Sequence, residues 1–275
     1  MSLPLVDTDK IAILRHPQRV WAVASVHGEA EKLARLHQEI AQRYRAGDRL
    51  VYLGNVIGWG SNSVGAVDQL LAFRRAVIGT QGMFAGDVAI LRGAQEEMWQ
   101  KLLQLQLALN PAEVLTWMLD QGIDATLKAY GGNAADGIVA ARSGAPACAR
   151  WTTLLRDAVH AHAGHTRFLS TLRRAAVTKP SDADSAPMLF VNAGLDVSRP
   201  LETQKDSYWW PSPGFDGVSE PYGDFACIVR GFNEQAGGLT EGPYTISVDG
   251  GAGRGGSLIA VCLDAAGAVV ETLET

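Results

Sequence analysis

Residues 19–28 read Arg-Val-Trp-Ala-Val-Ala-Ser-Val-His-Gly, an apolar run that ends in a polar loop. Apolar side chains then recur at helical spacing through residues 29–45, with charged residues between them. Further apolar runs at 48–54 and 87–93 are each followed by another helical pattern. This succession of strands and helices indicates parallel strands joined by right-handed crossovers. The sequence therefore predicts an α/β fold.

Three polar loops follow these apolar runs, and they begin at Ser25, Asn55 and Ala94. The helical patterns after the second and third loops cover residues 64–77 and 96–109. In parallel sheets, functional groups gather on the loops after the carboxyl ends of the strands. We therefore expect the functional residues of this half of the chain to lie on these three loops.

The rest of the chain has a mostly helical region, followed by a region of short predicted strands. Residues 111–179 have a mostly helical pattern, which is interrupted at Gly131, Gly132 and Asn133, and residues 180–187 form a polar connector. Short apolar runs then predict strands at 188–191, 225–229, 244–248, 257–262 and 268–271. The last three are separated by Gly-rich turns, which favours an antiparallel meander. We expect two sheets with helices outside them, in one domain covering residues 1–275.

The bulk composition limits the possible functions. The 275 residues are 47% hydrophobic and 19% charged, with a net charge of −5, which is typical of a globular protein without a broad basic surface. Nucleic-acid binding is therefore disfavoured. The chain shows no basic and apolar leader and no long apolar stretch, so we expect no membrane partner. Three widely spaced cysteines without a zinc pattern fit reduced thiols, and we expect a cytoplasmic protein.

The three loops resemble the motifs of the calcineurin-like metallophosphoesterases, which include bacterial serine/threonine protein phosphatases. That family carries GDxHG, GDxxDRG and GNHE at successive strand ends, and the corresponding stretches here are 24–28, 54–60 and 93–96. Its later V-H-A-G and HGHT motifs correspond to 191–194 and 230–233, and its closing Gly-rich motif resembles 249–258. The resemblance covers about residues 19–265 and implies a four-layer α/β/β/α sandwich.

Enzymes of this family hold two divalent cations that activate a bridging water. The resemblance places the six metal-ligand positions at Ser25, His27, Asn55, Ala94, Asn192 and Phe232. His27 alone keeps the residue type of the family, and both aspartate positions hold neutral residues. Two dications require anionic oxygen ligands, so we expect no metal here.

The remaining catalytic positions differ from the family as well. The resemblance places the general-acid histidine at Gln95 and the phosphate-binding arginine at Trp59, preceded by Gly58 in place of an aspartate. The nine positions together are called the vestigial cleft: Ser25, His27, Asn55, Gly58, Trp59, Ala94, Gln95, Asn192 and Phe232. We expect a catalytically inactive phosphatase-like protein without a cofactor. Its remodelled cleft would bind an unknown protein or small-molecule ligand in a regulatory role.

Other readings of these residues remain open. A residual or repurposed metal-dependent phosphoesterase would act on phosphoproteins or nucleotides, with His27 and one of Asp196, Asp249 or Glu96 around one metal. An anion site would be centred on Arg230 and Arg92, with Arg230 facing either an anion or Asp196.

Two further groups of residues have alternative interpretations. The family's later Trp-Ile-Arg is replaced by Trp209, Trp210 and Pro211. With Trp59, these tryptophans either fill the cleft or line a binding surface. On a helix, His162 and His165 share a face and His160 does not, so a zinc site there is the less favoured interpretation.

Overall fold

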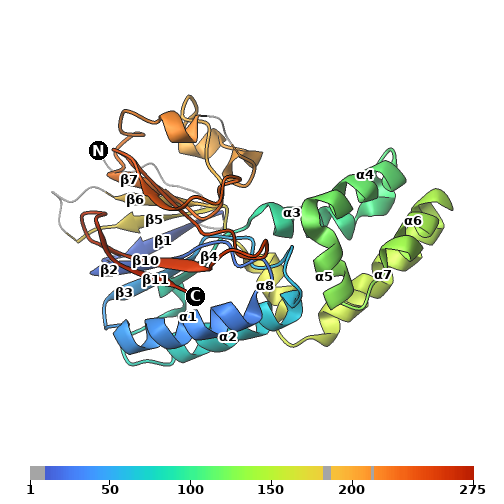
Figure 1. The fold of residues 1–275 in the computed structure, drawn as a ribbon, viewed down its shortest axis with the longest axis horizontal. Coiled ribbons are helices and arrows are strands. Elements are labelled where there is room, and N and C mark those ends of the chain that lie inside the picture. Colours follow the sequence, from blue (N-terminus) through green and yellow to red (C-terminus); the bar gives the residue numbers. More distant parts are fainter. Residues whose placement is uncertain (1–9, 182–186, 212–213) are drawn as a thin grey trace.

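The computed structural model describes residues 10–181, 187–211 and 214–275. Two sheets face each other, and helices α1 (Ala30–Arg43) and α2 (Ser63–Ile78) cover the outer face of one of them (Figure 1). Leu33, Leu36 and Ile40 of α1 are buried against that sheet, as the helical spacing predicted. The predicted α/β/β order of the first three layers is confirmed.

The sheet beneath these helices has five strands in the order β11-β10-β2-β3-β4. Its members are β2 (Arg19–Val23), β3 (Asp48–Tyr52), β4 (Val88–Ile90), β10 (Ile259–Asp264) and β11 (Val269–Glu274). Strands β2, β3 and β4 are parallel, which confirms the crossover prediction, and β10 and β11 add an antiparallel edge. The carboxyl ends of the three parallel strands therefore open onto one edge of the sheet.

The second sheet has the order β1-β5-β6-β7-β9-β8. Its members are β1 (Ile11–Arg15), β5 (Ala175–Lys179), β6 (Met188–Val191), β7 (Cys227–Arg230), β8 (Gly238–Glu241) and β9 (Thr245–Asp249). Strands β6 and β7 confirm predicted strands, whereas β1, β5 and β8 were not predicted. The helical interpretation up to residue 179 is wrong at its end, because four of the five β5 residues are buried and show no alternation.

The predicted meander is wrong for the first of its three strands, whereas β10 and β11 form an antiparallel pair as expected. Strand β9 pairs in parallel with β7 and antiparallel with β8, whereas β10 and β11 belong to the opposite sheet. Residues 250–258 carry the chain from one sheet to the other. Gly256 lies so close to Gly250 in this crossing that an added Cβ would be 1.9 Å from the Gly250 carbonyl oxygen. Gly-rich segments thus served a crossing between sheets here, not a hairpin.

The fourth layer lies on the outer face of the second sheet and contains short 3-10 helices at Leu201–Thr203, Asp206–Tyr208 and Phe215–Gly217. Tyr208, Trp209 and Phe215 are buried there in a hydrophobic cluster with Leu189 and Ile228 of the sheet. The four-layer sandwich is confirmed, with 3-10 helices in place of α-helices in this layer.

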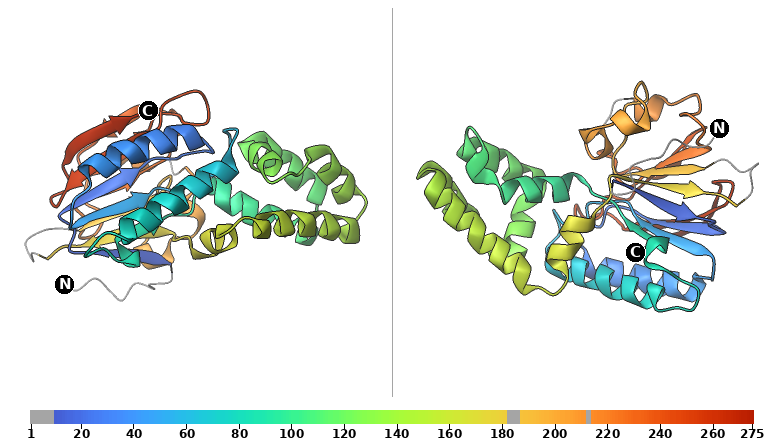
Figure 2. Two further views of the ribbon diagram at one scale, coloured as in Figure 1. Left: turned by 90° about the horizontal axis from the view of Figure 1, so that it is seen from below. Right: turned by 180° about the vertical axis from the view of Figure 1, so that it is seen from behind.

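A set of helices is inserted between β4 and β5: α3 (Ala94–Leu102), α4 (Pro111–Met118), α5 (Asp124–Ala129), α6 (Ala134–Arg142), α7 (Ala145–Ala161) and α8 (His165–Thr171). Residues 111–161, the helical lobe, project from the sandwich (Figures 1 and 2). The predicted break between helices is confirmed, because Asn133 caps α6 through its Oδ1, which accepts from the Ala135 N–H at 2.8 Å. The helix expected over 96–109 ends at Leu102 and continues as a short 3-10 segment.

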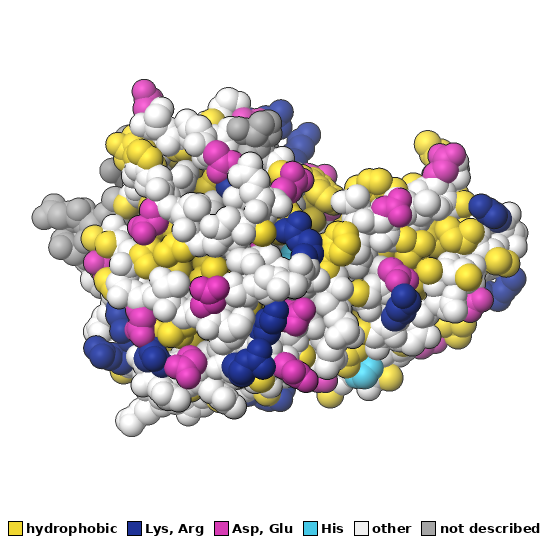
Figure 3. Space-filling view, in the orientation of Figure 1, with side chains coloured by type: hydrophobic (Ala, Val, Ile, Leu, Met, Phe, Trp, Pro, Cys, Tyr) yellow, Lys and Arg dark blue, Asp and Glu magenta, His cyan; other side chains and the backbone are white. Residues whose placement is uncertain are grey.

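Apolar side chains are prominent on the surface of the lobe (Figure 3). Trp117, Val139 and Leu154 are among the large hydrophobic residues exposed there. Cys148, Cys227 and Cys262 are buried and free, and burial raises the pKa of the Cys227 thiol to about 12. In the described ranges, no helix combines the length and apolarity that crossing a bilayer requires.

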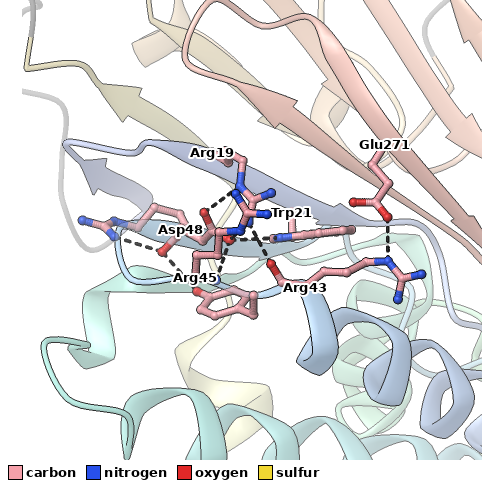
Figure 4. Close-up of polar contacts among 8 residues, drawn as sticks. Arg19, Trp21, Arg43, Arg45, Asp48 and Glu271 are labelled. Atoms are coloured by element: carbon pink, nitrogen blue, oxygen red, sulfur yellow. Dashed lines mark hydrogen bonds and ion pairs between the residues drawn. The ribbon is translucent and has the colours of Figure 1, made fainter.

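A charged network joins the amino ends of β2 and β3 (Figure 4). Asp48 is 1% exposed, and its carboxylate accepts from Arg19 Nε at 3.0 Å and Nη2 at 2.6 Å. The Trp21 indole N–H and the Arg45 backbone N–H donate to the same carboxylate, at 3.3 and 2.9 Å. This buried charge is therefore compensated on every side by donors.

Candidate functional site

The predicted loops meet at the carboxyl ends of the strands. The Ser25 backbone N–H donates to the Gly231 carbonyl at 2.9 Å, which joins the loop after β2 to the loop after β7. Asn192, after β6, donates through Nδ2 to the Leu53 carbonyl at 2.6 Å. The His27 and Phe232 rings meet edge to face, with centroids 5.8 Å apart. The order of the loops along the chain thus predicted the members of one site.

Neutral hydrogen bonds link the positions where the family has aspartates. Asn55 Nδ2 donates to Ser25 Oγ at 3.2 Å, and Asn55 Oδ1 accepts from the Gln95 backbone N–H at 3.0 Å. Asn55 is 1% exposed and Ser25 is fully buried. The side-chain amide is therefore held in place as a donor to serine and an acceptor from the α3 backbone. This arrangement needs no cation to hold it together.

His27 is the one position that keeps the metal-ligand type of the family. Its ring is buried, and neither ring nitrogen has a hydrogen-bond partner in the described part of the chain. Burial, together with the nearby positive charge of Arg254, lowers the pKa of His27 to about 3, although the Ile57 backbone acts in the opposite direction. The imidazole is therefore neutral at pH 7, without a carboxylate to orient it.

Gln95 occupies space that Gly58 leaves free. An added Cβ at Gly58 would lie 2.6 Å from the Gln95 Cγ, and Gly58 has a φ of 117°. The Gln95 Nε2 donates to the Gln121 carbonyl at 2.8 Å, which ties the site to the helical lobe. An amide has no proton to give near neutral pH, so Gln95 has a structural position and no general-acid chemistry.

Glu96 is engaged by the backbone, although it was a candidate metal ligand. Its carboxylate accepts from the backbone N–H groups of Gly93, Asn55 and Val56 at 2.8, 2.9 and 2.7 Å, and from Ile57 at 3.2 Å. Burial raises the pKa of Glu96, and these donors oppose that rise. Glu96 thus fixes the loop after β3 to the start of α3.

The other two candidate carboxylates are also engaged elsewhere. Asp249 accepts from the backbone N–H groups of Asn233 and Gly251 at 2.8 and 2.9 Å. Asp196 accepts from the Ser198 hydroxyl at 2.6 Å and pairs with Arg199 at 3.0 Å. Neither carboxylate contacts His27. The combination of His27 with a carboxylate around one metal is therefore not formed in this arrangement.

The donor set does not fit a pair of divalent cations. It consists of one imidazole, a hydroxyl and neutral amides, while Ala94 and Phe232 offer no donor. Within residues 10–181, 187–211 and 214–275, no three His, Cys, Asp or Glu side chains group as metal ligands. Hard divalent cations take anionic oxygen ligands, which this edge of the sheets does not supply.

Arg230 and Arg92 do not form a shared anion site. Arg230 pairs with Asp216 at 2.5 Å, donates to Ser247 and lies over the Phe215 ring, 4.2 Å from its centroid. Of the interpretations considered for Arg230, the salt-bridged arginine fits the structure, and its partner is Asp216 rather than Asp196, which pairs with Arg199. Arg92 pairs with Glu97 at 2.7 Å. Each arginine has its own carboxylate, so neither charge is available at the cleft.

The cationic residue beside the cleft is Arg254, which sequence reasoning missed. Its guanidinium lies 5.7 Å from the centroid of the Phe232 ring, and its charge acts on His27. Arg254 is exposed, and no ion pair to a carboxylate forms at it within the described ranges. A lone arginine within the Gly-rich run 250–256 was the available signal.

The crossing loop covers the cleft. An added Cβ at Gly253 would lie 2.5 Å from the His27 Cβ and 3.2 Å from the Trp59 Cβ. Gly253 has a φ of 80°, which favours glycine. The backbone of this loop therefore lies directly on the Cβ and the carbonyl oxygen of His27.

The three tryptophans occupy different places. Trp209 is buried in the fourth layer, and Trp210 lies 5.9 Å from the ring of Trp117 in the lobe. Trp59 is 40% exposed, and its ring lies against Gly122 of the lobe. Of the two interpretations left open, Trp209 fits core filling, whereas Trp59 lies at the exposed junction of sandwich and lobe.

The histidine group forms a packing cluster. The His162 and His165 rings stack with centroids 5.1 Å apart, but not on one helix as expected, because α7 ends at Ala161 and α8 begins at His165. His165 Nδ1 bonds to the Tyr130 hydroxyl at 2.7 Å and Nε2 to Asp68 at 3.2 Å. Both nitrogens of His165 are thus engaged, which leaves it no lone pair for zinc.

Two facing sheets with helices outside them form the four-layer sandwich that the resemblance implied. Among solved structures, the chain is similar to a putative diadenosine tetraphosphatase, with 17% identity, coverage of 96% of this chain and 97% of the other, and a TM-score of 0.54. It is also similar to a cold-active protein-tyrosine phosphatase of a psychrophile Shewanella species, with 13% identity, coverage of 97% and 84%, and a TM-score of 0.54. At these identities the likeness shows the fold. No family model and no curated protein matches the chain.

Proposed function

We propose that this chain is a catalytically inactive protein of the phosphatase-type fold that binds a partner at the surface over the vestigial cleft. The observation that carries the proposal is the hydrogen bond between Asn55 and Ser25 at the two aspartate positions. A neutral pair at this place cannot balance the charge of two divalent cations.

The chemistry of the other groups supports the same proposal. Phosphoester hydrolysis in this type of site requires an activated water and a group that protonates the leaving oxygen. His27 is neutral and buried beneath Gly253, and Gln95 supplies no acid. What these residues do instead is hold the strand-end loops together, because Asn55, Asn192 and Gln95 each donate or accept across two loops.

The binding surface proposed for the partner consists of Trp59 and Arg254. Gly253, next to Arg254, packs against the Trp59 Cβ, so the two side chains leave the backbone at neighbouring places. Tryptophan and arginine are the residues that most often dominate binding energy at interfaces. A partly exposed indole beside an unpaired guanidinium suits a protein or small molecule that presents an acidic group next to a flat apolar one.

Hydrolysis of p-nitrophenyl phosphate and of its diester, with added Mn²⁺, tests catalytic inactivity. We expect the wild-type protein and a His27→Ala variant purified in parallel to show the same background rate. Elemental analysis of the purified protein should find no stoichiometric transition metal. Turnover that disappears in His27→Ala would contradict the proposal and favour the residual phosphoesterase.

Phenyl phosphate tests the binding surface, since it combines an aromatic ring with an anion. Saturating phenyl phosphate should raise the melting temperature by mass action. The rise should be lost in Arg254→Ala and reduced in Trp59→Ala. Arg142→Ala, an exposed arginine at the end of α6, is the matched control and should keep the full rise. A shift that survives Arg254→Ala would place the binding elsewhere.

A further inference from the structure

A separate cavity of about 630 Å³ lies between α3, α7 and α8. Its volume falls within the range of small-molecule sites. The apolar part of its lining comes from Trp99, Leu103, Val159 and Leu169. His160, Thr166 and Ser170 line it as well and are exposed, so the cavity opens to solvent past these three residues.

The apolar surface that a ligand can reach in this cavity belongs to Leu103 and Leu169, which are half-buried. Trp99 is fully buried, and its ring stacks on Tyr130 with centroids 5.3 Å apart. An aromatic pair therefore supports the apolar side of the cavity.

Arg156 provides a positive charge at the lining of this cavity. Its guanidinium donates to the Leu103 carbonyl at the end of α3, and in the described ranges it forms no ion pair with a carboxylate. Arg92, which also lines the cavity, is already paired with Glu97. A guanidinium that is held in place by a carbonyl keeps donors and a full charge for an anionic group.

Two carboxylates limit how much negative charge the cavity accepts. Asp157 is exposed at the lining, and Glu96 lies at the cavity but gives its oxygens to backbone N–H groups. A ligand with two negative charges would be repelled by Asp157, whereas a single charge can be placed on Arg156.

We propose that this cavity binds a small amphipathic monoanion, with its flat apolar part on Leu103 and Leu169 and its carboxylate or sulfonate on Arg156. This site is independent of the partner surface at Trp59 and Arg254, which contributes no residue to the lining. Helix α3 borders both regions, because Glu96 fixes the strand-end loop and Trp99 lines the cavity.

Titration of the full chain with 1-anilinonaphthalene-8-sulfonate, an aromatic monoanion, tests the proposal. We expect a saturable one-to-one rise in dye fluorescence. Arg156→Gln keeps a donor for the Leu103 carbonyl but loses the charge, and should weaken binding by about tenfold. Arg150→Gln, on the exposed face of the same helix, is the matched control and should change the dissociation constant less than about twofold.

Competition defines the ligand class. Naphthalene-1-carboxylate should displace the dye about tenfold better than its neutral amide, and inorganic phosphate should not displace it. Arg254→Ala should leave dye binding unchanged, so this proposal and the proposed function fail separately. Equal binding by Arg156→Gln, non-saturating binding, or equal displacement by the amide would each overturn the proposal. If Arg156→Gln does not fold, Ser170→Trp at the exposed mouth replaces it and should block the dye.

Discussion

The two ends of β2 and β3 differ in the charge of their buried polar side chains and in the hydrogen-bond partners of these side chains. At the amino ends, the Asp48 carboxylate is surrounded by donors from Arg19, Trp21 and Arg45 (Figure 4). At the carboxyl ends, the aspartate positions hold neutral Ser25 and Asn55, and His27 has two ring nitrogens without partners. The Glu96 carboxylate at this end is compensated by backbone N–H groups, so the contrast lies in the two neutral aspartate positions and in His27.

This difference separates what the fold requires from what phosphoester chemistry requires. A buried carboxylate is stable only where donors or cations compensate it. Asp48 has protein donors for this, whereas carboxylates at positions 25 and 55 would depend on metal ions. The sandwich forms with uncharged residues at positions 25 and 55, so the fold does not require the charges that the chemistry requires.

The largest expected loss of unfolding free energy follows from removing the negative charge of Asp48. Asp48→Asn removes the negative charge but leaves Arg19, and one oxygen cannot accept from all the present donors. Breaking such a pair costs roughly 3 kcal/mol of unfolding free energy, at the low end because Arg19 is partly exposed. The urea midpoint measures it. In Arg19→Gln/Asp48→Asn the loss should be smaller than the sum of the single losses, and additive losses would contradict the network.

Placing a carboxylate at position 55 should lower the unfolding free energy by less than the loss of the Asp48 charge does. Asn55→Asp keeps the size and the backbone conformation of the residue, but it places a carboxylate at a site that is 1% exposed. Gln95 N–H and Ser25 Oγ can still donate to it, so we expect a loss of roughly 2 kcal/mol in urea unfolding.

Added Mn²⁺ tests whether the Asn55→Asp variant binds a metal ion at this edge of the sheets. If the edge lacks a metal site, saturating Mn²⁺ should leave the urea midpoints of wild type and Asn55→Asp unchanged. Ser25→Ala, which removes a neutral partner without adding charge, is the control and should lose about 1 kcal/mol. Recovery of Asn55→Asp by Mn²⁺ would show that one carboxylate is enough to rebuild the site.

Acid should destabilise the protein through its buried histidines. Burial lowers the pKa of both His27 and His37 to about 3, against about 6.5 in the unfolded chain. Below about pH 6.5 the unfolded state therefore binds protons that the folded state does not. The unfolding free energy is then lost as pH falls, by up to about 1.4 kcal/mol per pH unit for each histidine.

Urea midpoints between neutral pH and about pH 5 measure this slope, above the range where exposed carboxylates titrate. His27→Gln and His37→Gln should each make the slope shallower. His160→Gln, which changes an exposed histidine, should leave it as in wild type. An unchanged slope in His27→Gln would mean that its ring is protonated in the folded protein.

The sequence predicted the parallel strands and their loops because their signals are local. The apolar runs ending at Ser25 and Asn55 and the helical spacing of Leu33 and Leu36 depend on neighbours in the chain. Strand β5 was missed because it is buried without alternation, and β9 was paired wrongly because pairing is set by contacts far apart in sequence.

The site was predictable to the same extent. The loops at 25, 55 and 94 followed from the shared edge of parallel strands, whereas Asn192 and Phe232 followed from the resemblance to the family motifs. Their partners did not, because Glu96 faces four backbone N–H groups and Arg230 faces Asp216, contacts that depend on loop geometry. Arg254 was missed for the same reason, since the path of its Gly-rich loop over His27 is set by the crossing between sheets.

The smallest expected effect concerns the contact between Gly58 and Gln95. Gly58→Ala should cost about 1–2 kcal/mol from its positive φ and add a clash with the Gln95 side chain. Gln95→Ala removes the clash but not the backbone strain, so the double variant should recover about 1 kcal/mol relative to additivity. Gly86→Ala, where an added Cβ meets no atom within 4 Å, is the control and should show no coupling to Gln95→Ala. Full additivity at Gly58 would mean that Gln95 does not occupy the space left by the missing side chain, and the neutral end would then be open rather than filled.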